Sequence, residues 1–204
     1  MKNIAIIGAG SHTRSSLNII KQNFTNQKIQ IFDDSFNPHE DEFITDIKLC
    51  GRVEDIENDA SVFLSIGDNK KRALYFKTFQ NQIIKENLFH NTAIKEENIQ
   101  VGISNQIFAQ AYINSLVKIG DNNILNTASI LEHEVVIGSH NHISVGAKLC
   151  GRVRIGNNCT IGAGAIIIDK ISICDNVIIG AGAVVVDNIT ESGTYVGVPA
   201  RKIK

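Results

Sequence analysis

A branched aliphatic residue occupies every sixth position of this chain from Val101 to Val185. The run is unbroken over fifteen positions, which a composition of 43% hydrophobic residues does not produce by chance. A period of six matches neither a helix nor a plain strand, and it is typical of a parallel β-helix, whose short strands stack coil upon coil around one core. The aliphatic positions are Val101, Ile107, Ile113, Ile119, Leu125, Leu131, Ile137, Ile143, Leu149, Ile155, Ile161, Ile167, Ile173, Ile179 and Val185.

A second period, of eighteen residues, is superimposed on the first. Ile-Gly pairs recur at Ile119, Ile137 and Ile155, each followed by a polar turn. Eighteen residues are three hexads, so we expect triangular coils whose three turns are rich in Gly and Asn, because these residues tolerate positive φ. Small or β-branched residues lie four positions after most of the aliphatics, as tight corners require, whereas Asn123 and Asn141 loosen this pattern.

The N-terminal part of the chain predicts a small α/β domain of the βαβαβ, half-Rossmann type. Three apolar runs, 3–7, 28–32 and 61–66, are predicted to be parallel strands. A glycine turn at 8–12 precedes an amphipathic segment, and a further helix is expected after residue 69. We therefore expect an α/β domain over 1–90, a β-helix over 91–190 and a C-terminal tail over 191–204.

The predicted sheet suggests a nucleotide site, because open parallel sheets bind ligands beyond the carboxyl ends of their strands. The turn at 8–12 and the helix that starts there can receive phosphate. Asp33 or Asp34 can accept hydrogen bonds from a ribose or a base, although ordinary turn chemistry also explains this pair. The dinucleotide fingerprint is incomplete, because Thr13 stands where the third glycine belongs. A mononucleotide or a nucleotide-sugar therefore fits better than NAD.

Composition narrows the class of protein further. The formal net charge is −1, from 20 basic and 21 acidic residues, so nothing attracts the chain generally to nucleic acid or to an anionic membrane. The apolar run from Ile4 to Ile7 is too short for a signal peptide or a membrane span. The four cysteines form no CxxC pair, which favours reduced thiols. We expect a cytoplasmic protein without membrane insertion or nucleic-acid binding.

A group of titratable residues lies within one stretch of the hexads. Glu132 and Glu134 flank His133, and a histidine beside a carboxylate can act as a general base. The residue one coil after His133 is Gly151, whose missing side chain is expected to leave a slot for a ligand. His140 and His142 follow in the same stretch.

The stretch from Asn126 to Gly151 closely resembles the bacterial sugar-nucleotide N-acetyltransferases of the bacillosamine pathway, the PglD-like enzymes. The broader group includes the sialic acid O-acetyltransferases of the NeuD family. The motifs EHE and SHNHISVGAK are its more specific part, since many acyltransferases share the hexads. The resemblance extends to GAGSH, the acidic pair, the IGDN turn and the VGVPA segment, at 8–12, 33–34, 66–69 and 196–200.

This resemblance implies a left-handed β-helix, a homotrimer with active sites between subunits, and acetyl-CoA as cosubstrate without a metal. It implies that His133 is the general base and Glu134 its partner. The implied substrate-binding residues are His12, Gly10, Ser11, Asp33, Asp34, Gly67, Asn126 and His142. The implied coenzyme-binding residues are His142, Gly151, Ala163, Ala181 and, in the C-terminal tail, Pro199. The family usually has glycine on both sides of the first-turn histidine, and Ser11 and Thr13 stand there here, so the nucleotide stays open.

The reaction expected from the resemblance is acetyl transfer to the C4 amine of a 4-amino-4,6-dideoxy sugar linked to UDP. The amine would attack the thioester directly while His133 removes its proton, and a backbone N–H near Gly151 or His142 would stabilise the oxyanion. O-acetylation of a sugar hydroxyl is an alternative that would use much the same base. A trimeric zinc lyase of the carbonic anhydrase type, with His133, His140 and His142 as ligands, and an NAD-binding N-terminal domain are alternatives from other classes.

Overall fold

The computed structural model describes residues 3–204, and the chain divides into two compact units, Met1–Lys85 and Glu86–Lys204. The second unit begins ahead of the expected boundary at residue 91, because β6 (Leu88–Phe89) already pairs with β9 (Gln106–Ile107) of the following coil. No helix within residues 3–204 is long and apolar enough to cross a membrane.

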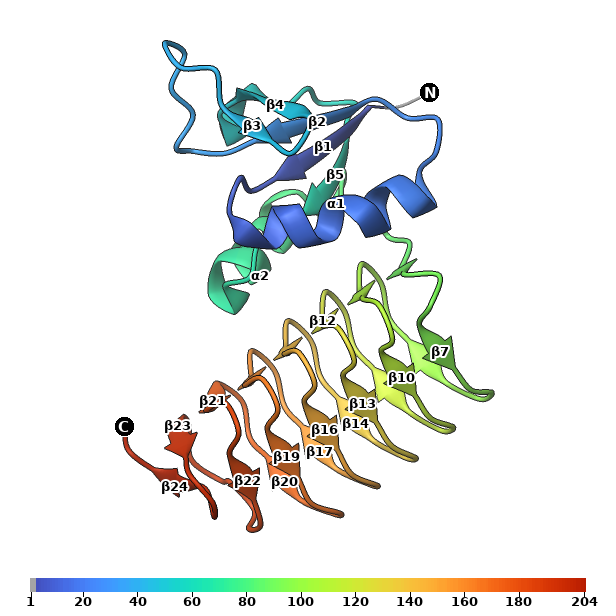
Figure 1. Ribbon diagram of the computed structural model, residues 1–204, viewed down its shortest axis with the longest axis vertical. Coiled ribbons are helices and arrows are strands. Elements are labelled where there is room, and N and C mark those ends of the chain that lie inside the picture. Colours follow the sequence, from blue (N-terminus) through green and yellow to red (C-terminus); the bar gives the residue numbers. More distant parts are fainter. Residues whose placement is uncertain (1–2) are drawn as a thin grey trace. The chain divides into compact units, whose positions relative to one another are not determined.

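The N-terminal unit is built on a five-stranded sheet in the order β3-β4-β2-β1-β5 (Figure 1). β1 (Ile4–Ile7), β2 (Ile29–Phe32), β4 (Ile47–Gly51) and β5 (Ser61–Leu64) are parallel, and β3 (Phe43–Ile44) pairs antiparallel with β4. Every residue of β1 is buried, as expected for a central strand of a parallel sheet.

Two α-helices accompany this sheet. α1 (Ser11–Asn23) buries Leu17, Ile19 and Ile20, and α2 (Asn69–Thr78) begins after Asp68, whose carboxylate accepts the Lys71 backbone N–H at 2.7 Å. The second crossover differs from the predicted βαβαβ pattern. Between β2 and β5 the chain forms the β3–β4 hairpin and a 3₁₀ turn, η1 (Val53–Asp55), rather than a helix. This charged segment places a fourth parallel strand beside β2.

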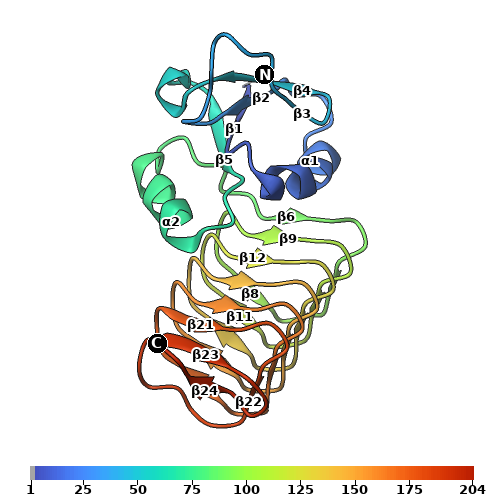
Figure 2. The same cartoon turned by 60° about the vertical axis from the view of Figure 1, so that its left-hand side comes forward.

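The second unit is a left-handed parallel β-helix (Figures 1 and 2). Its short strands form three sheets of eight, five and six strands, and strands eighteen residues apart pair in register. The eight-stranded sheet contains β6, β9, β12 (Ile124–Leu125), β15 (His142–Ile143), β18 (Thr160–Ile161), β21 (Val177–Ile179), β23 (Gly193–Val196) and β24 (Arg201–Lys202). The five-stranded sheet contains β8 (Gln100–Val101), β11 (Lys118–Ile119), β14 (Val136–Ile137), β17 (Arg154–Ile155) and β20 (Ser172–Ile173). The six-stranded sheet contains β7 (Ile94–Lys95), β10 (Tyr112–Ile113), β13 (Ile130–Leu131), β16 (Lys148–Leu149), β19 (Ile166–Ile167) and β22 (Val184–Val185).

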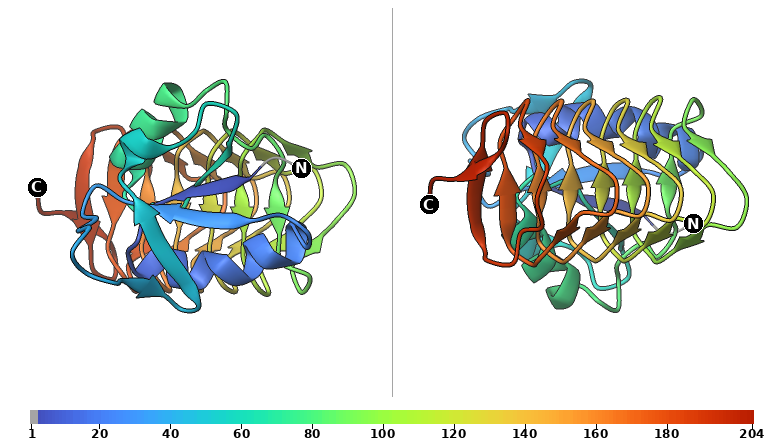
Figure 3. Two further views of the ribbon diagram at one scale, coloured as in Figure 1. Left: turned by 90° about the horizontal axis from the view of Figure 1, so that it is seen from above. Right: turned by 90° about the horizontal axis from the view of Figure 1, so that it is seen from below.

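The hexad aliphatics form the core of this β-helix. All of them from Ile107 to Val185 are buried, and Val101, in the first full coil, is partly buried. The turns repeat just as regularly, because every sixth residue from Asn98 to Gly182 has positive φ. Glu134 and Arg152 both adopt this conformation, with φ of 62°. The backbone therefore repeats with the same period as the core, and Figure 3 shows the coils in projection.

Asn123 and Asn141, which depart from the pattern of small corner residues, form a buried ladder with Asn105 along one corner. All three side chains are completely buried. Asn105 Oδ1 accepts the backbone N–H of Asn123 and Asn123 Oδ1 that of Asn141, both at 2.8 Å. Each side-chain amide also donates to a glycine carbonyl of the next coil, at 2.9–3.0 Å. Amide stacking explains why these residues occupy a corner expected to hold small side chains.

Candidate active site

His133 and Glu134 lie together in the turn between β13 and β14. His133 Nδ1 is 3.1 Å from Glu134 Oε2, and about half of each side chain is exposed. An ionised carboxylate only accepts hydrogen bonds, so in the neutral imidazole Nδ1 carries the hydrogen and Nε2 keeps its lone pair. The pair has the arrangement of a general base held by a carboxylate.

Gly151 lies against the edge of the His133 ring. A Cβ placed on Gly151 would be 2.6 Å from both Cε1 and Nε2 of His133, so any side chain there collides with the imidazole. The predicted open slot over Gly151 is therefore wrong in one respect, because the His133 ring itself takes up the space that the missing side chain leaves. The glycine is required so that this ring can lie where it does.

Two further residues surround this position and were not predicted from the sequence. Asp169 Oδ1 lies 3.2 Å from the same Cβ position on Gly151. Arg152 holds this carboxylate, with Nε 3.1 Å from Oδ1 and a terminal nitrogen 2.7 Å from Oδ2. The Arg152 hydrogen bond lowers the pKa of Asp169. Stacking arithmetic could have found Asp169, because it follows His133 by two coils of eighteen residues.

Asn126 and His142 form a second pair. Asn126 Nδ2 is 3.2 Å from His142 Nε2, and Asn126 Oδ1 accepts the Thr127 backbone N–H at 2.8 Å. Of the backbone N–H groups near Gly151 or His142 that were expected to stabilise an oxyanion, that of His142 is engaged within the sheet, where it donates to Cys159 O at 2.9 Å. The sequence neighbours of Gly151 are engaged in the same way, since the N–H groups of Cys150 and Arg152 donate to carbonyls of other coils.

The other predicted coenzyme-binding residues, Ala163, Ala181 and Pro199, are small residues at the surface. Ala163 and Ala181 are exposed and lie one coil apart on the same corner, where the Gly182 N–H donates to Ala163 O at 2.8 Å. Each alanine is followed by a glycine with positive φ. Pro199 is also exposed, in the connection between β23 and β24.

The first glycine turn, predicted to be a phosphate site, leads directly into α1. Gly10 precedes α1, no acidic residue lies in the first helical turn, and a Cβ on Gly10 would meet nothing within 4 Å. Ser11 is exposed, and His12 Cβ lies 4.0 Å from the corresponding position on Gly67. The completely buried Thr13 donates to Gly8 O at 2.7 Å, so the residue that breaks the dinucleotide fingerprint closes this turn.

Asp33 stabilises the same turn from β2. Its Oδ2 accepts the Ala9 N–H at 2.9 Å, and its Oδ1 accepts the N–H and the hydroxyl of Ser35 at 3.0 and 2.8 Å. Burial alone would raise the pKa of Asp33, but these hydrogen bonds hold it below its usual value. Asp33 therefore has the structural role in a turn that the sequence allows as the alternative to nucleotide binding.

Asp34 contacts α2. Its Oδ2 accepts the Tyr75 hydroxyl at 2.7 Å, and Lys71 Nζ lies 3.9 Å from the same oxygen. Burial and the bond to Asp34 raise the pKa of Tyr75 to about 12. Arg72 on the same helix is completely buried and donates to the carbonyls of Ile66 and Gly67, which fixes the predicted turn at Gly67. No signal in the sequence indicated these roles of Tyr75 and Arg72, although both follow the IGDN turn closely.

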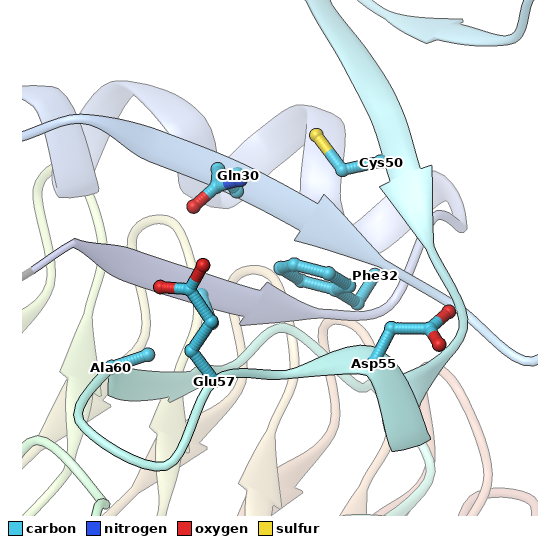
Figure 4. A pocket seen from close by; sticks show the side chains of 7 residues that line it. Gln30, Phe32, Cys50, Asp55, Glu57 and Ala60 are labelled. Carbon is cyan, nitrogen blue, oxygen red and sulfur yellow. The ribbon is translucent and has the colours of Figure 1, made fainter.

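The N-terminal sheet also carries a hollow of about 200 Å³. Figure 4 shows the side chains around it, with the Phe32 ring, the Cys50 thiol and the carboxylates of Asp55 and Glu57. None of the predicted nucleotide-binding residues lines this hollow.

Each histidine of the 126–151 stretch has a different partner. His133 is paired with Glu134 and His142 with Asn126, and His140 Nδ1 is 2.8 Å from Asn122 Nδ2. In the part of the chain that the structure describes, no three His, Cys, Asp or Glu side chains are grouped as ligands for a metal.

Comparisons with known proteins agree with this architecture. Residues 3–79 match the PglD N-terminal domain, and residues 152–187 match the bacterial transferase hexapeptide, six repeats. No curated protein sequence matches the chain significantly.

Solved structures match over nearly the full length. The acetyltransferase domain of PglB from Neisseria gonorrhoeae in complex with acetyl coenzyme A is 25% identical, with a TM-score of 0.90 and 99% of each chain covered. A GDP-perosamine N-acetyltransferase variant from Caulobacter crescentus, in complex with CoA and GDP-perosamine, is 25% identical, with a TM-score of 0.90, covering 100% of this chain and 98% of that one. WeeI from Acinetobacter baumannii, at 16% identity and a TM-score of 0.75 over both whole chains, shares the fold.

Proposed function

Because this chain is a sugar N-acetyltransferase of the PglD type, we propose that it transfers the acetyl group of acetyl-CoA to the C4 amine of a nucleotide-linked 4-amino-4,6-dideoxy sugar. The observation that carries this proposal is the His133–Glu134 pair at 3.1 Å, with Nε2 turned to the bare backbone of Gly151. Among possible nucleotides we favour UDP, and the structure of a relative with GDP-perosamine makes GDP the first competitor to test.

The proposed step is a direct transfer. The amine nitrogen attacks the thioester carbon, the new C–N bond forms and the C–S bond breaks, while Nε2 of His133 takes a proton from the amine. Glu134 keeps the ring oriented through Nδ1 and stabilises the imidazolium that forms. The leaving CoA thiolate can take its proton from that imidazolium. A thioester is already activated, so the chain needs no acyl-enzyme.

In this proposal the residues that bind the nucleotide and those that bind the coenzyme belong to different units. In the N-terminal unit Gly10, Ser11, His12, Asp33, Asp34 and Gly67 hold the nucleotide, with the phosphates at the start of α1. In the β-helix Asn126 and His142 contact the reacting groups, and His142, Gly151, Ala163, Ala181 and Pro199 contact the coenzyme. The exposed alanines and their positive-φ glycines support this, because they let a ligand approach the backbone closely.

We further propose a homotrimer with active sites between subunits, acting in the cytoplasm. Support comes from the separation of the two histidine pairs, because His133 and His142 stand nine residues, half a coil, apart along the chain. A site between subunits would bring one pair from each chain to the same substrate.

The test is a thiol-release assay with acetyl-CoA and a panel of UDP-, GDP- and dTDP-linked 4-amino sugars. Wild type should release CoA with one nucleotide preferred, and His133→Ala should lower kcat by about 10²- to 10⁴-fold. His140→Ala is the matched control, because that ring bonds to Asn122 away from His133, and it should keep its rate. Undiminished transfer by His133→Ala would remove the assignment of the base, and no turnover with any amino sugar would reject the function.

A further inference from the structure

A second carboxylate faces the proton-accepting edge of His133. Asp169 Oδ1 and His133 Nε2 lie 3.2 and 2.6 Å from one point, the position of a Cβ on Gly151. The two atoms are therefore no more than about 5.8 Å apart (2.6 Å plus 3.2 Å). Glu134 lies on the other side of the ring, on Nδ1.

This separation suits one nitrogen atom. A hydrogen bond from nitrogen spans about 2.9 Å, so a single amine can reach both atoms at any separation up to about 5.8 Å. The remaining lone pair of that amine is then free to attack. One amine nitrogen can therefore donate hydrogen bonds to both Nε2 and Oδ1.

We propose that Asp169 selects an amine over a hydroxyl as the acetyl acceptor, by accepting the second N–H of the attacking amine. This inference rests on the proposed function, with His133 as the base. An amine has two hydrogens, one for His133 and one for Asp169. A hydroxyl has one, which His133 needs, so its oxygen would face the Asp169 carboxylate with lone pairs only.

Each of the two amine hydrogens has a defined fate in this step. The hydrogen shared with His133 leaves as the C–N bond forms, and the one shared with Asp169 stays on nitrogen as the N–H of the product amide. Asp169 is thus not a base; it keeps the same hydrogen bond from substrate to product.

Arg152 prepares Asp169 for this role. It binds both carboxylate oxygens, at 3.1 and 2.7 Å, and Lys170 Nζ lies 4.0 Å from Oδ2. Each carboxylate oxygen can accept two hydrogen bonds, so Oδ1 keeps a site for the substrate. The lowered pKa of Asp169 keeps this acceptor ionised at neutral pH.

The experiment compares Asp169→Ala with Asp187→Ala. Asp187 follows Asp169 by eighteen residues and, like it, lies beside an arginine, with Arg201 at 3.6 Å, so it matches Asp169 in residue type and in having a cationic partner, although its side chain is more exposed, 76% against 42%. The assay uses the best nucleotide-linked 4-amino sugar and its 4-hydroxy counterpart, each with acetyl-CoA.

For Asp169→Ala we expect kcat/KM for the amino sugar to fall about ten- to a hundred-fold, as the loss of a hydrogen bond to a charged group implies. The KM of acetyl-CoA should stay at the wild-type level, and the rate with the hydroxy sugar should stay the same or rise, because the carboxylate that faces the hydroxyl lone pairs is gone. The preference for the amine therefore narrows by at least the same factor. Asp169→Asn, with an uncharged acceptor, should fall between wild type and Asp169→Ala. Asp187→Ala should behave as wild type.

An Asp169→Ala rate equal to that of Asp187→Ala would overturn the inference. So would equal losses for both acceptors, which indicate a structural role, or a change confined to the KM of acetyl-CoA, which places Asp169 on the coenzyme. Thermal unfolding of the two variants shows whether a loss reflects folding. A wild type inactive with every amino sugar rejects the proposed function, whereas an active wild type with an indifferent Asp169→Ala rejects this inference alone.

Discussion

In the proposed mechanism a single imidazole, His133, carries the proton transfer, and three neighbours position it. Glu134 binds its Nδ1, Gly151 makes room for its ring, and Asp169 faces the opposite edge. Glu134 does so from a backbone conformation, φ of 62°, that favours glycine or asparagine. The same conformation recurs at every sixth residue of the β-helix, so it belongs to the turn and not to the site.

Glu134→Gln should therefore lower kcat by about 10- to 100-fold, because a neutral amide stabilises the imidazolium less well than a carboxylate. Steady-state kinetics with the preferred amino sugar measure this. Glu132→Gln is the matched control, since Glu132, on the other side of His133 in sequence, accepts from Asn114 Nδ2 at 2.7 Å. If both glutamine variants keep wild-type kcat, Glu134 does not assist the base.

At the scale of the element, the corners of the coil differ in what holds them. The corner at Asn105, Asn123 and Asn141 is a hydrogen-bonded ladder, whereas the corresponding corner position Ser129 is buried with a hydroxyl that has no hydrogen-bond partner within residues 3–204. Removing a ladder amide should thus cost far more than removing that hydroxyl.

Asn123→Ala should lower the free energy of unfolding by about 2–4 kcal/mol, because it leaves the Asn141 N–H and the Gly138 carbonyl with a missing partner in the interior. Ser129→Ala should change it by less than about 0.5 kcal/mol or stabilise the protein, since only an unpaired polar atom is lost. Urea unfolding monitored by circular dichroism distinguishes the two. Equal effects would mean that the ladder contributes no more than the packing of small side chains.

The hexads predicted the β-helix, its core and its turn period, because a repeated pattern reports a repeated environment. The role of Asn123 and Asn141 could not be predicted from the hexads. A buried asparagine and an exposed turn asparagine are the same in sequence, and only the residue stacked on each of them distinguishes the two. In the N-terminal unit β4 was not predicted. It lies in the charged stretch before residue 60, and its alternation of buried and exposed residues covers too few positions to be recognised. Asp169 escaped notice because the His133 ring that it faces is 36 residues away in sequence.

At the scale of the whole molecule, the proposed trimer makes a quantitative prediction. His133→Ala and His142→Ala chains, each inactive alone, should regain about a quarter of wild-type activity when refolded together, because random mixing places one intact His133 opposite one intact His142 at a quarter of the interfaces. Light scattering should give three times the 22.3 kDa chain mass in every sample. If both histidines of a site came from the same chain, mixing would restore nothing.

The regular turns also constrain how such a molecule can change over evolution. Because the left-handed conformation recurs at every sixth residue, a single-codon insertion inside the solenoid would put the wrong side chains inward for every coil downstream. Duplication of a gene segment that encodes one entire coil would preserve the phase and merely lengthen the prism. Descendants of this protein should therefore differ in size by whole coils, with the imidazole, the bare backbone and the carboxylate inherited as a block.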